Sequence, residues 1–377
     1  MSAKRRPAAG TRPASAADPA GVPDTLLRAL PKTDLHLHLD GSLRLETILD
    51  LAREQGIRLP ASDPESLGRL VRMGAGERSL EHYLRAFDVT LAVLQEKEAL
   101  ERAAWELASD CADENVRYIE VRFSPILHTR HGLSLKESVE AARAGLERAE
   151  AERGIQTGII LCGIRHISPE SSLVLAQLAL EYKGAGVVGF DLAGAEEHFP
   201  AKKHREAFFL ILNNNINCTV HAGEAFGPSS IAQAVHYCGA HRIGHGTRLR
   251  EDPDLMDYVN DHRIPLEICL SSNVQTGAVP SLEEHPIKYY LDAGLRVTLN
   301  TDNRLMSATD LTNEYALGIH HCGLTLHDLE EIIIFGFKSA FLPLKRKSEL
   351  LRAAIKDIRQ LTAPYHEPEE PIHEANI

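Results

Sequence analysis

The chain has 377 residues, of which 44% are hydrophobic and 25% are charged, a composition typical of a globular protein with a large core. Its formal net charge of −12 argues against a nucleic acid or an anionic membrane as partner, because both carry negative charge. No apolar run approaches membrane-spanning length, and six scattered cysteines without a Cys-x-x-Cys pair predict reduced thiols and a cytoplasmic location.

Composition divides the chain into three parts. Residues 1–22 are rich in Ala, Pro, Arg and Ser without apolar periodicity, which predicts a disordered N-terminal arm. Residues 364–377 are rich in proline and glutamate and are expected to form a loose C-terminal tail. Residues 23–363 are therefore predicted to form a single domain.

Short apolar, β-branched runs alternate with longer segments of helical periodicity inside this domain. The predicted strands are residues 33–38, 116–123, 157–164, 187–192, 218–221, 242–245, 265–270 and 296–301. The predicted helices are residues 100–111, 134–152, 169–182, 202–213, 229–238, 252–262 and 282–293. Residues 44–94 are expected to add helices over one end of the sheet, and residues 311–361 to be mostly helical.

Strands that alternate with helices predict a parallel sheet and an α/β protein. Eight such units predict a closed (β/α)8 barrel of the TIM type with extra helices, whose active site lies at the carboxyl ends of the strands. An open doubly wound sheet is the alternative. It is disfavoured because no Gly-x-Gly-x-x-Gly turn follows any predicted strand.

The first predicted strand carries two histidines, His36 and His38, whose side chains point to the same face. Inward imidazoles need a partner, and a metal ion is an efficient one. Taken alone, the pair would more readily lie on the solvated face of an edge strand. The Asp40-Gly41-Ser42 turn that follows favours a site at the strand end.

Titratable or amide groups stand at the ends of nearly all the other strands. They lie in residues 191–194, 221–224, 244–246, 271–273 and 300–303. Scattered core histidines would not collect in this way. Together, His36, His38, His221 and Asp302 offer three nitrogens and one oxygen with room for water. This set suits a single zinc ion, and iron or manganese is the alternative.

Three more residues at these ends are candidates for catalysis or binding. Glu224 can give and take protons, or it is an acid that only favours a helix start. His245 can hold an activated water or stabilise charge on oxygen, or it is a satisfied core histidine. Gly194 offers its backbone to a ligand, or it is an ordinary turn glycine.

These motifs, taken in this order, resemble those of the adenosine deaminase family of metal-dependent hydrolases. The likeness runs from about residue 31 to residue 344. The resemblance implies a (β/α)8 barrel with one zinc ion per chain. It also implies hydrolytic deamination of adenosine and 2′-deoxyadenosine to inosine and ammonia, with small purine nucleosides and water as partners. It leaves the oligomeric state open.

The resemblance also implies a role for each matching residue. His36, His38, His221 and Asp302 look like the zinc ligands, Glu224 like the proton donor to purine N1, His245 like the residue that orients the attacking hydroxide, Gly194 like a contact to the purine edge, and Asp40, beside His38, like the partner of a ribose hydroxyl. Tyr83 and Phe87 look like a hydrophobic lid over the base, although aromatic residues at helical spacing are also typical of a core.

One departure from the family pattern concerns the substrate. The family commonly has a second aspartate and then proline after the ligand aspartate, whereas Asp302 is followed by Asn303 and Arg304. A side-chain amide donates a hydrogen bond without any change of protonation, so we expect Asn303 to bind purine N7.

Two alternatives to adenosine deamination remain open, namely a different 6-aminopurine substrate and an inactive barrel. Relatives deaminate aminodeoxyfutalosine or adenine, but Asp40 argues against free adenine, which has no sugar. An inactive nucleoside-binding barrel would be expected to have a broken ligand set. The deaminases with cysteine-liganded zinc require a Pro-Cys-x-x-Cys motif, which is absent, so His204 and Glu206 match only half of their pattern.

Overall fold

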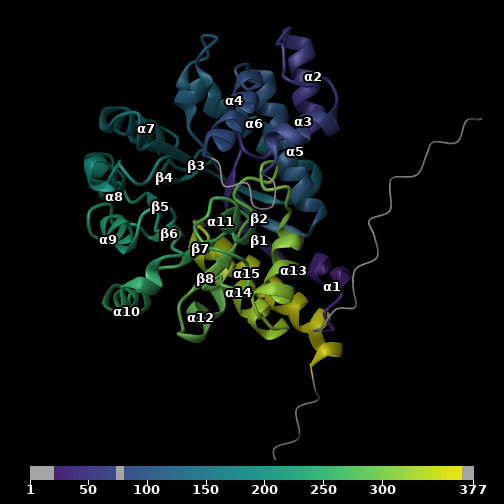
Figure 1. Ribbon diagram of the computed structural model, residues 1–377, viewed down its shortest axis with the longest axis vertical. Helices are drawn as coiled ribbons and strands as arrows, with labels where there is room; N and C mark the ends of the chain where they lie inside the picture. The colour runs from purple at the N-terminus through teal and green to yellow at the C-terminus, as the bar shows by residue number, and fades with distance from the viewer. Residues whose placement is uncertain (1–20, 74–79, 367–377) are drawn as a thin grey trace, which may run out of the picture.

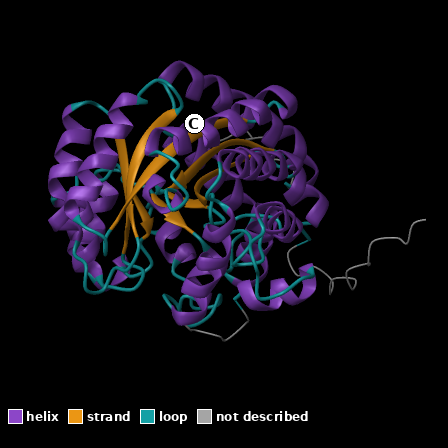
Figure 2. Ribbon diagram, turned by 90° about the horizontal axis from the view of Figure 1, so that it is seen from above, coloured by secondary structure: helices purple, strands orange, loops and turns teal. Residues whose placement is uncertain are grey.

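The protein is described here by a computed structural model, which covers residues 21–73 and 80–366, with only the backbone for residues 80–85. Eight parallel strands lie at the centre of the part that is described, with helices around them (Figure 2). The strands are β1 (Lys32–His38), β2 (Val116–Phe123), β3 (Gln156–Ile164), β4 (Val187–Ala193), β5 (Asn217–Ala222), β6 (Arg242–His245), β7 (Leu266–Ile268) and β8 (Val297–Leu299). Each pairs with the next in chain order, which confirms the predicted barrel architecture.

Asp302, three residues after the end of β8, links this end of the sheet back to β1. The Asp302 N–H donates to the His36 carbonyl at 2.8 Å, and the His38 N–H donates to the Asp302 carbonyl at 2.8 Å. An isolated parallel bridge joins Leu37 to Asp302. The backbone contacts that bring the two ends of the sheet together therefore also bring a candidate metal ligand beside two others.

The helices surround the strands and gather most densely beyond β1 and β2. They are α1 (Asp24–Ala29), α2 (Leu45–Gln55), α3 (Pro64–Val71), α4 (Leu80–Val93), α5 (Lys97–Asp113), α6 (Leu135–Arg153), α7 (Pro169–Glu181), α8 (Arg205–Asn213), α9 (Pro228–His236), α10 (Pro253–Asp261), α11 (Leu270–Gln275), α12 (Ile287–Asp292), α13 (Leu311–His321), α14 (Leu326–Ser339) and α15 (Leu344–Thr362). The extra helices expected in residues 44–94 are α2, α3 and α4, at the top of Figure 1.

Several predicted elements differ from the structure at their boundaries, and three of them are as follows. The predicted helix 282–293 is reduced to α12, because Pro286 stands at its N-cap and the His285 ring accepts the Ile287 N–H at 3.1 Å. The predicted strand 265–270 ends at Ile268, and α11 begins two residues later. The predicted helix 202–213 begins as a 3-10 turn, η2 (Ala201–His204), before α8.

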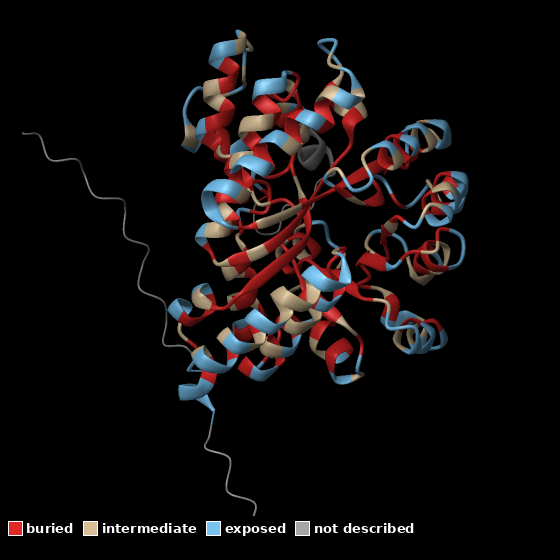
Figure 3. Ribbon diagram, turned by 180° about the vertical axis from the view of Figure 1, so that it is seen from behind, coloured by how far each residue is buried: buried red, intermediate tan, exposed pale blue. Residues whose placement is uncertain are grey.

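The core lies between the barrel strands and the inner faces of the helices, whose outer faces are exposed (Figure 3). Val22 is buried in the core, although the sequence analysis placed it in the disordered arm expected for residues 1–22. Residues 1–20 and 367–377 lie outside the described residues. Within the described part of the chain, no helix is long and apolar enough to cross a membrane.

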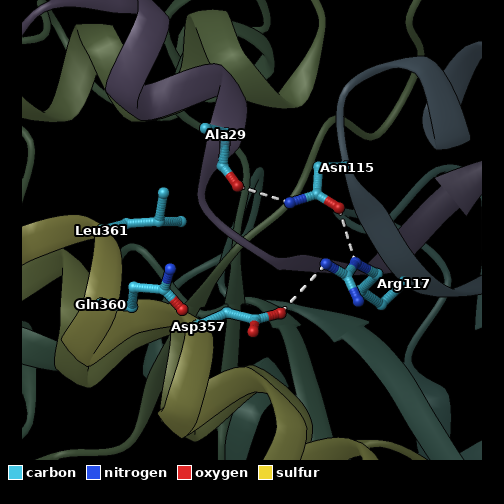
Figure 4. Close-up of a pocket in the computed structure, with 6 residues that line it drawn as sticks. All are labelled: Ala29, Asn115, Arg117, Asp357, Gln360 and Leu361. Atoms are coloured by element: carbon cyan, nitrogen blue, oxygen red, sulfur yellow. Dashed lines mark hydrogen bonds and ion pairs between the residues drawn. The ribbon is translucent and has the colours of Figure 1, made fainter.

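A pocket of about 270 Å³ lies near the amino-terminal end of β2, between α1 and α15 (Figure 4). Its polar side chains bond to one another: Arg117 Nε donates to Asn115 Oδ1 at 2.6 Å, and Arg117 Nη2 donates to Asp357 at 3.2 Å. The Asn115 amide donates to the Ala29 carbonyl. The conspicuous grouping of histidines lies instead at the carboxyl ends of the strands.

Candidate active site

Four histidines and one aspartate meet at the carboxyl ends of β1, β5, β6 and β8. Potential ligand atoms of His36, His221, His245 and Asp302 all lie within 4.8 Å of one another. His38 joins them, because its Nε2 lies 3.2 Å from His221 Nε2 and 3.4 Å from Asp302 Oδ1. We call these five residues the His/Asp cluster. The structure thus brings together the four ligands expected from the sequence, with His245 beside them.

The His/Asp cluster fits a metal ion by its chemistry and by one orphaned atom. His36 Nε2 is buried without a hydrogen-bond partner among the described residues, and lies 3.5 Å from Asp302 Oδ1. Several imidazole nitrogens and one carboxylate are the donor set that zinc and similar ions prefer. A bound cation would satisfy His36 Nε2 and separate the closely packed ring nitrogens.

The surroundings favour the protonation states that metal binding requires at His36, His38 and Asp302, whereas at His221 the charge of Asp191 outweighs burial and raises the pKa. Burial, assisted by the positive charge of Arg122, lowers the pKa of His36 to about 4. Burial also lowers the pKa of His38 well below its usual value. Burial alone would raise the pKa of Asp302, but the adjacent His36 and His38 rings hold it well below the usual range. Neutral imidazoles and an ionised carboxylate are the ligating forms.

Two buried carboxylates orient two of the histidine rings from behind. The Glu267 carboxylate lies 2.8 Å from His36 Nδ1, and the Asp191 carboxylate lies 3.0 Å from His221 Nδ1. Arg122 bridges the two carboxylates, at 2.9 Å from Asp191 and 3.0 Å from Glu267. Such contacts fix the ring orientation and leave the opposite nitrogen, Nε2, facing the centre of the cluster.

Glu267 is itself held by charges on its other side. Its Oε1 accepts hydrogen bonds from Arg242 Nε at 2.5 Å and from Thr219 Oγ1 at 3.0 Å. Burial alone would raise the pKa of Glu267, but Arg122 and Arg242 keep it well below its usual value. Sequence reasoning did not single out Arg122 or Glu267. The available signal was a charged residue between two apolar ones in a strand: Arg122 lies between Val121 and Phe123, and Glu267 between Leu266 and Ile268.

His245 occupies a constrained position next to the cluster. Its φ of 63° lies in the left-handed region, which is sparsely populated by residues other than glycine and is often found at functional sites. The Asn273 side-chain amide lies 3.0 Å from His245 Nδ1. An amide that donates to Nδ1 leaves the proton of a neutral ring on Nε2, which lies 3.5 Å from the Glu224 carboxylate.

Glu224 sits at the edge of the site, where solvent still reaches it. Its side chain is 21% exposed, and Oε1 accepts a hydrogen bond from Thr276 Oγ1 at 2.9 Å. Oε2 faces His245. A carboxyl group that is anchored through one oxygen and lies beside a metal-type cluster is suited to proton transfer. Asn273 belongs to the run 271–273 that the sequence analysis placed at a strand end, whereas Thr276, at the C-cap of α11, was not among the predicted site residues.

The residues expected to contact a substrate differ in how far they are buried. Asp40 is buried, its Oδ1 has no hydrogen-bond partner within the described part of the chain, and burial raises its pKa to about 7. Gly194 is exposed and has a φ of 93°. Phe87 is half-buried and packs against the core, whereas the side chain of Tyr83 lies outside the described residues.

Asn303 packs directly over Gly41, and this contact explains the glycine. A Cβ atom at Gly41 would lie 1.7 Å from Asn303 Oδ1, so no other residue fits without displacing the Asn303 amide. The next residue, Arg304, anchors the same loop: its N–H donates to Ser42 Oγ at 3.1 Å, and its guanidinium pairs with Glu114 at 2.5 Å. The loops after β1 and β8 are therefore locked together beside the cluster.

Comparisons with known proteins agree with this geometry. The family model described as "Adenosine deaminase" matches residues 31–357. The chain is 44% identical to "Adenosine deaminase 1" of Streptomyces coelicolor, over 92% of each chain. It is 41% identical to a "Probable adenosine deaminase" of Dictyostelium discoideum over 88% of this chain, although it spans only 43% of that protein's length. Among solved structures, an adenine deaminase from Arthrobacter aurescens has a TM-score of 0.82 and 26% identity, over 89% of this chain and 99% of that one.

Proposed function

Because the chain belongs to the adenosine deaminase family, we propose that it catalyses the hydrolytic deamination of adenosine and 2′-deoxyadenosine to inosine and ammonia. The observation that carries this proposal is the position of Glu224, 3.5 Å from His245, beside a buried set of ligand atoms that lie within 4.8 Å of one another and include that of His245. A proton donor next to a metal-type cluster is the equipment that hydrolysis of an amino-purine requires.

We further propose that one zinc ion binds per chain, held by His36, His38, His221 and Asp302. The orphaned Nε2 of His36 and the short distances between the ring nitrogens support this assignment. When bound, zinc supplies Lewis acidity that lowers the pKa of water to near neutrality. Ser272 keeps Asp302 in place, because Ser272 Oγ donates to Asp302 Oδ2 at 2.6 Å.

The residues of the chain then divide the proton transfers between them. Glu224, protonated, donates to purine N1 as water adds to C6, which removes the negative charge that would otherwise develop on the ring. His245, with its proton on Nε2, orients the attacking oxygen and stabilises the charge on it. Glu224, ionised by that transfer, takes a proton from the attacking water and passes it to the 6-amino group. The remaining hydroxyl proton returns to Glu224 as the C6 carbonyl forms and ammonia leaves.

We assign substrate binding to the residues that the family resemblance indicates. Asp40, beside His38, binds a ribose hydroxyl through its unpartnered Oδ1. The Gly194 backbone contacts the purine edge, and Asn303 donates to N7. Tyr83 and Phe87 cover the base. A cytoplasmic location is proposed as well, since all six cysteines are buried free thiols.

Purified protein of known metal content tests this function directly through the absorbance change between adenosine and inosine. We expect about one zinc per chain and a kcat for adenosine of at least about 1 s⁻¹. We also expect kcat/KM for adenosine to exceed that for adenine by at least about tenfold, because adenine leaves Asp40 without its partner. Turnover of adenine alone, or of a 5′-extended adenosine alone, would show that this compound and not adenosine is the substrate. Metal binding without turnover of any of these compounds would contradict the proposal.

Substitution of Asn303 tests the contact to N7. The Asn303→Ala variant should lower kcat/KM for adenosine by about three- to tenfold, the value of one hydrogen bond, and should change that for 7-deazaadenosine much less. The Asn303→Asp variant should also reduce the preference for adenosine over 7-deazaadenosine, because an ionised carboxylate cannot donate a hydrogen bond to N7. Where 7-deazaadenosine reacts too slowly, its inhibition constant replaces kcat/KM. Parallel changes for both compounds would show that Asn303 provides something other than an N7 contact.

A further inference from the structure

The turn that carries Glu224 is built around a buried acid from a neighbouring strand end. Glu196 lies in the loop after β4, two residues beyond Gly194, and only 7% of it is exposed. Strands β4 and β5 are neighbours in the barrel (Figure 1), so this loop lies beside the turn that follows β5. Glu196 is far from Glu224 in sequence, and no motif assigned it a role.

Glu196 accepts hydrogen bonds from four successive backbone N–H groups. Oε1 accepts the Gly223 N–H at 2.7 Å. Oε2 accepts the N–H groups of Glu224 at 3.1 Å, Ala225 at 2.6 Å and Phe226 at 3.0 Å. Converging N–H groups of this kind form an anion-binding concavity, and hydrogen bonds to an ionised carboxylate are stronger than neutral ones. Here the anion is supplied by the chain itself.

The carbonyl groups of the same turn are held from the other side. The Gly223 carbonyl accepts Thr247 Oγ1 at 2.8 Å and the Arg248 N–H at 3.1 Å. The His221 carbonyl accepts Arg165 Nη2, from the end of β3. Gly223 has a φ of 72°, and a Cβ there would lie 2.4 Å from Ile231, so this turn requires glycine at its first position.

We propose that Glu196 is a positioning residue, whose buried carboxylate fixes the 223–226 turn and thereby aims the Glu224 side chain at the substrate. The side chain of Glu224 is partly exposed and is held at its tip by Thr276 Oγ1. Its direction therefore depends on the backbone from which it projects. Displacement of a reacting group by about 1 Å can cost about a hundredfold in rate, so the backbone anchor has catalytic consequences. This inference rests on the role proposed above for Glu224.

The Glu196→Gln variant tests the inference, because glutamine keeps the shape but offers one acceptor oxygen and an NH2 group to four N–H donors. We expect kcat for adenosine to fall about 10- to 100-fold while KM stays within about threefold and the metal content is unchanged. The matched control is Glu197→Gln, which removes the same charge from an exposed neighbour in the same loop and should leave kcat unchanged. An unchanged kcat in Glu196→Gln would overturn the proposal.

A double variant separates positioning from a general loss of structure. If Glu196 acts through Glu224, Glu196→Gln should cost little further activity in a Glu224→Gln background, whereas independent effects would multiply. Multiplied losses would contradict the proposal.

If Glu196→Gln does not fold, Glu196→Asp decides the question. It keeps the charge but not the reach, and should show a smaller loss of kcat with the same KM, so an undiminished kcat would count against the proposal.

Hydrogen exchange distinguishes failure of this inference from failure of the proposed function. The amides of residues 223–226 should exchange faster in Glu196→Gln than in Glu197→Gln, whatever reaction the protein catalyses. Unchanged exchange would overturn the positioning role even in a fully active deaminase. If exchange is faster but the protein does not deaminate adenosine, Glu196 still anchors the 223–226 turn and only the proposed reaction is rejected.

Discussion

Replacement of Glu224 by glutamine is expected to lower kcat for adenosine by about a thousandfold, within the range that a general acid–base group contributes. Glutamine has the same shape and can still accept from Thr276 Oγ1, so the turn and its side-chain contact should persist. It has no acidic proton to give to N1. The KM for adenosine should change little, because the loss falls on the transition state rather than on ground-state binding.

The measurement combines steady-state kinetics with metal analysis and thermal unfolding on the same preparation. Metal content and Tm should match the wild type, because Glu224 is not a proposed ligand. Glu206→Gln provides the control: it is an exposed acid on α8 and belongs to the chance His-x-Glu match of the sequence, and its removal should have no effect on kcat. Activity of Glu224→Gln within about tenfold of the wild type would reject the acid–base role.

The sequence predicts the barrel well because each of its units carries its own signal. An apolar strand such as 157–164 is recognisable without knowing its neighbours, and the polar residues at strand ends converge once the strands are parallel. Apolar periodicity fails as a signal where a single residue sets the end of a helix. Pro286 and the His285 ring shorten the helix predicted at 282–293, since a cap overrides periodicity there.

The supporting part of the site is harder to predict than its centre. His36 and His38 are visible as a pair, whereas the Glu267 that orients His36 lies 231 residues away. An acid in a short strand does not reveal whether its partner is water, an arginine or a histidine. Glu196 is a stronger example, because an acid in a Gly-Ala-Glu-Glu loop is typical of a solvated surface. Only the approach of the β5 turn gives it four donors.

Replacement of His221 by alanine is expected to abolish stoichiometric metal binding and to lower activity at least about a thousandfold, since the metal is assigned the activation of water. The fold should survive, because the Asp191 that His221 would leave behind keeps its ion pair with Arg122 at 2.9 Å. Loss of one of few protein ligands removes both binding energy and the closed donor geometry.

Elemental analysis of the His221→Ala protein measures the loss directly and also identifies the metal in the wild type. Added zinc should raise the Tm of the metal-free wild type, because a ligand that binds only the folded state stabilises it, and should not raise that of His221→Ala. Asp191→Asn gives a graded comparison: it keeps every ligand but loses the carboxylate behind His221, and should weaken metal affinity by about 10- to 100-fold. Normal metal content in His221→Ala would refute the ligand assignment. Equal losses in both variants would indicate that Asp191 contributes as much to metal binding as the ring it orients.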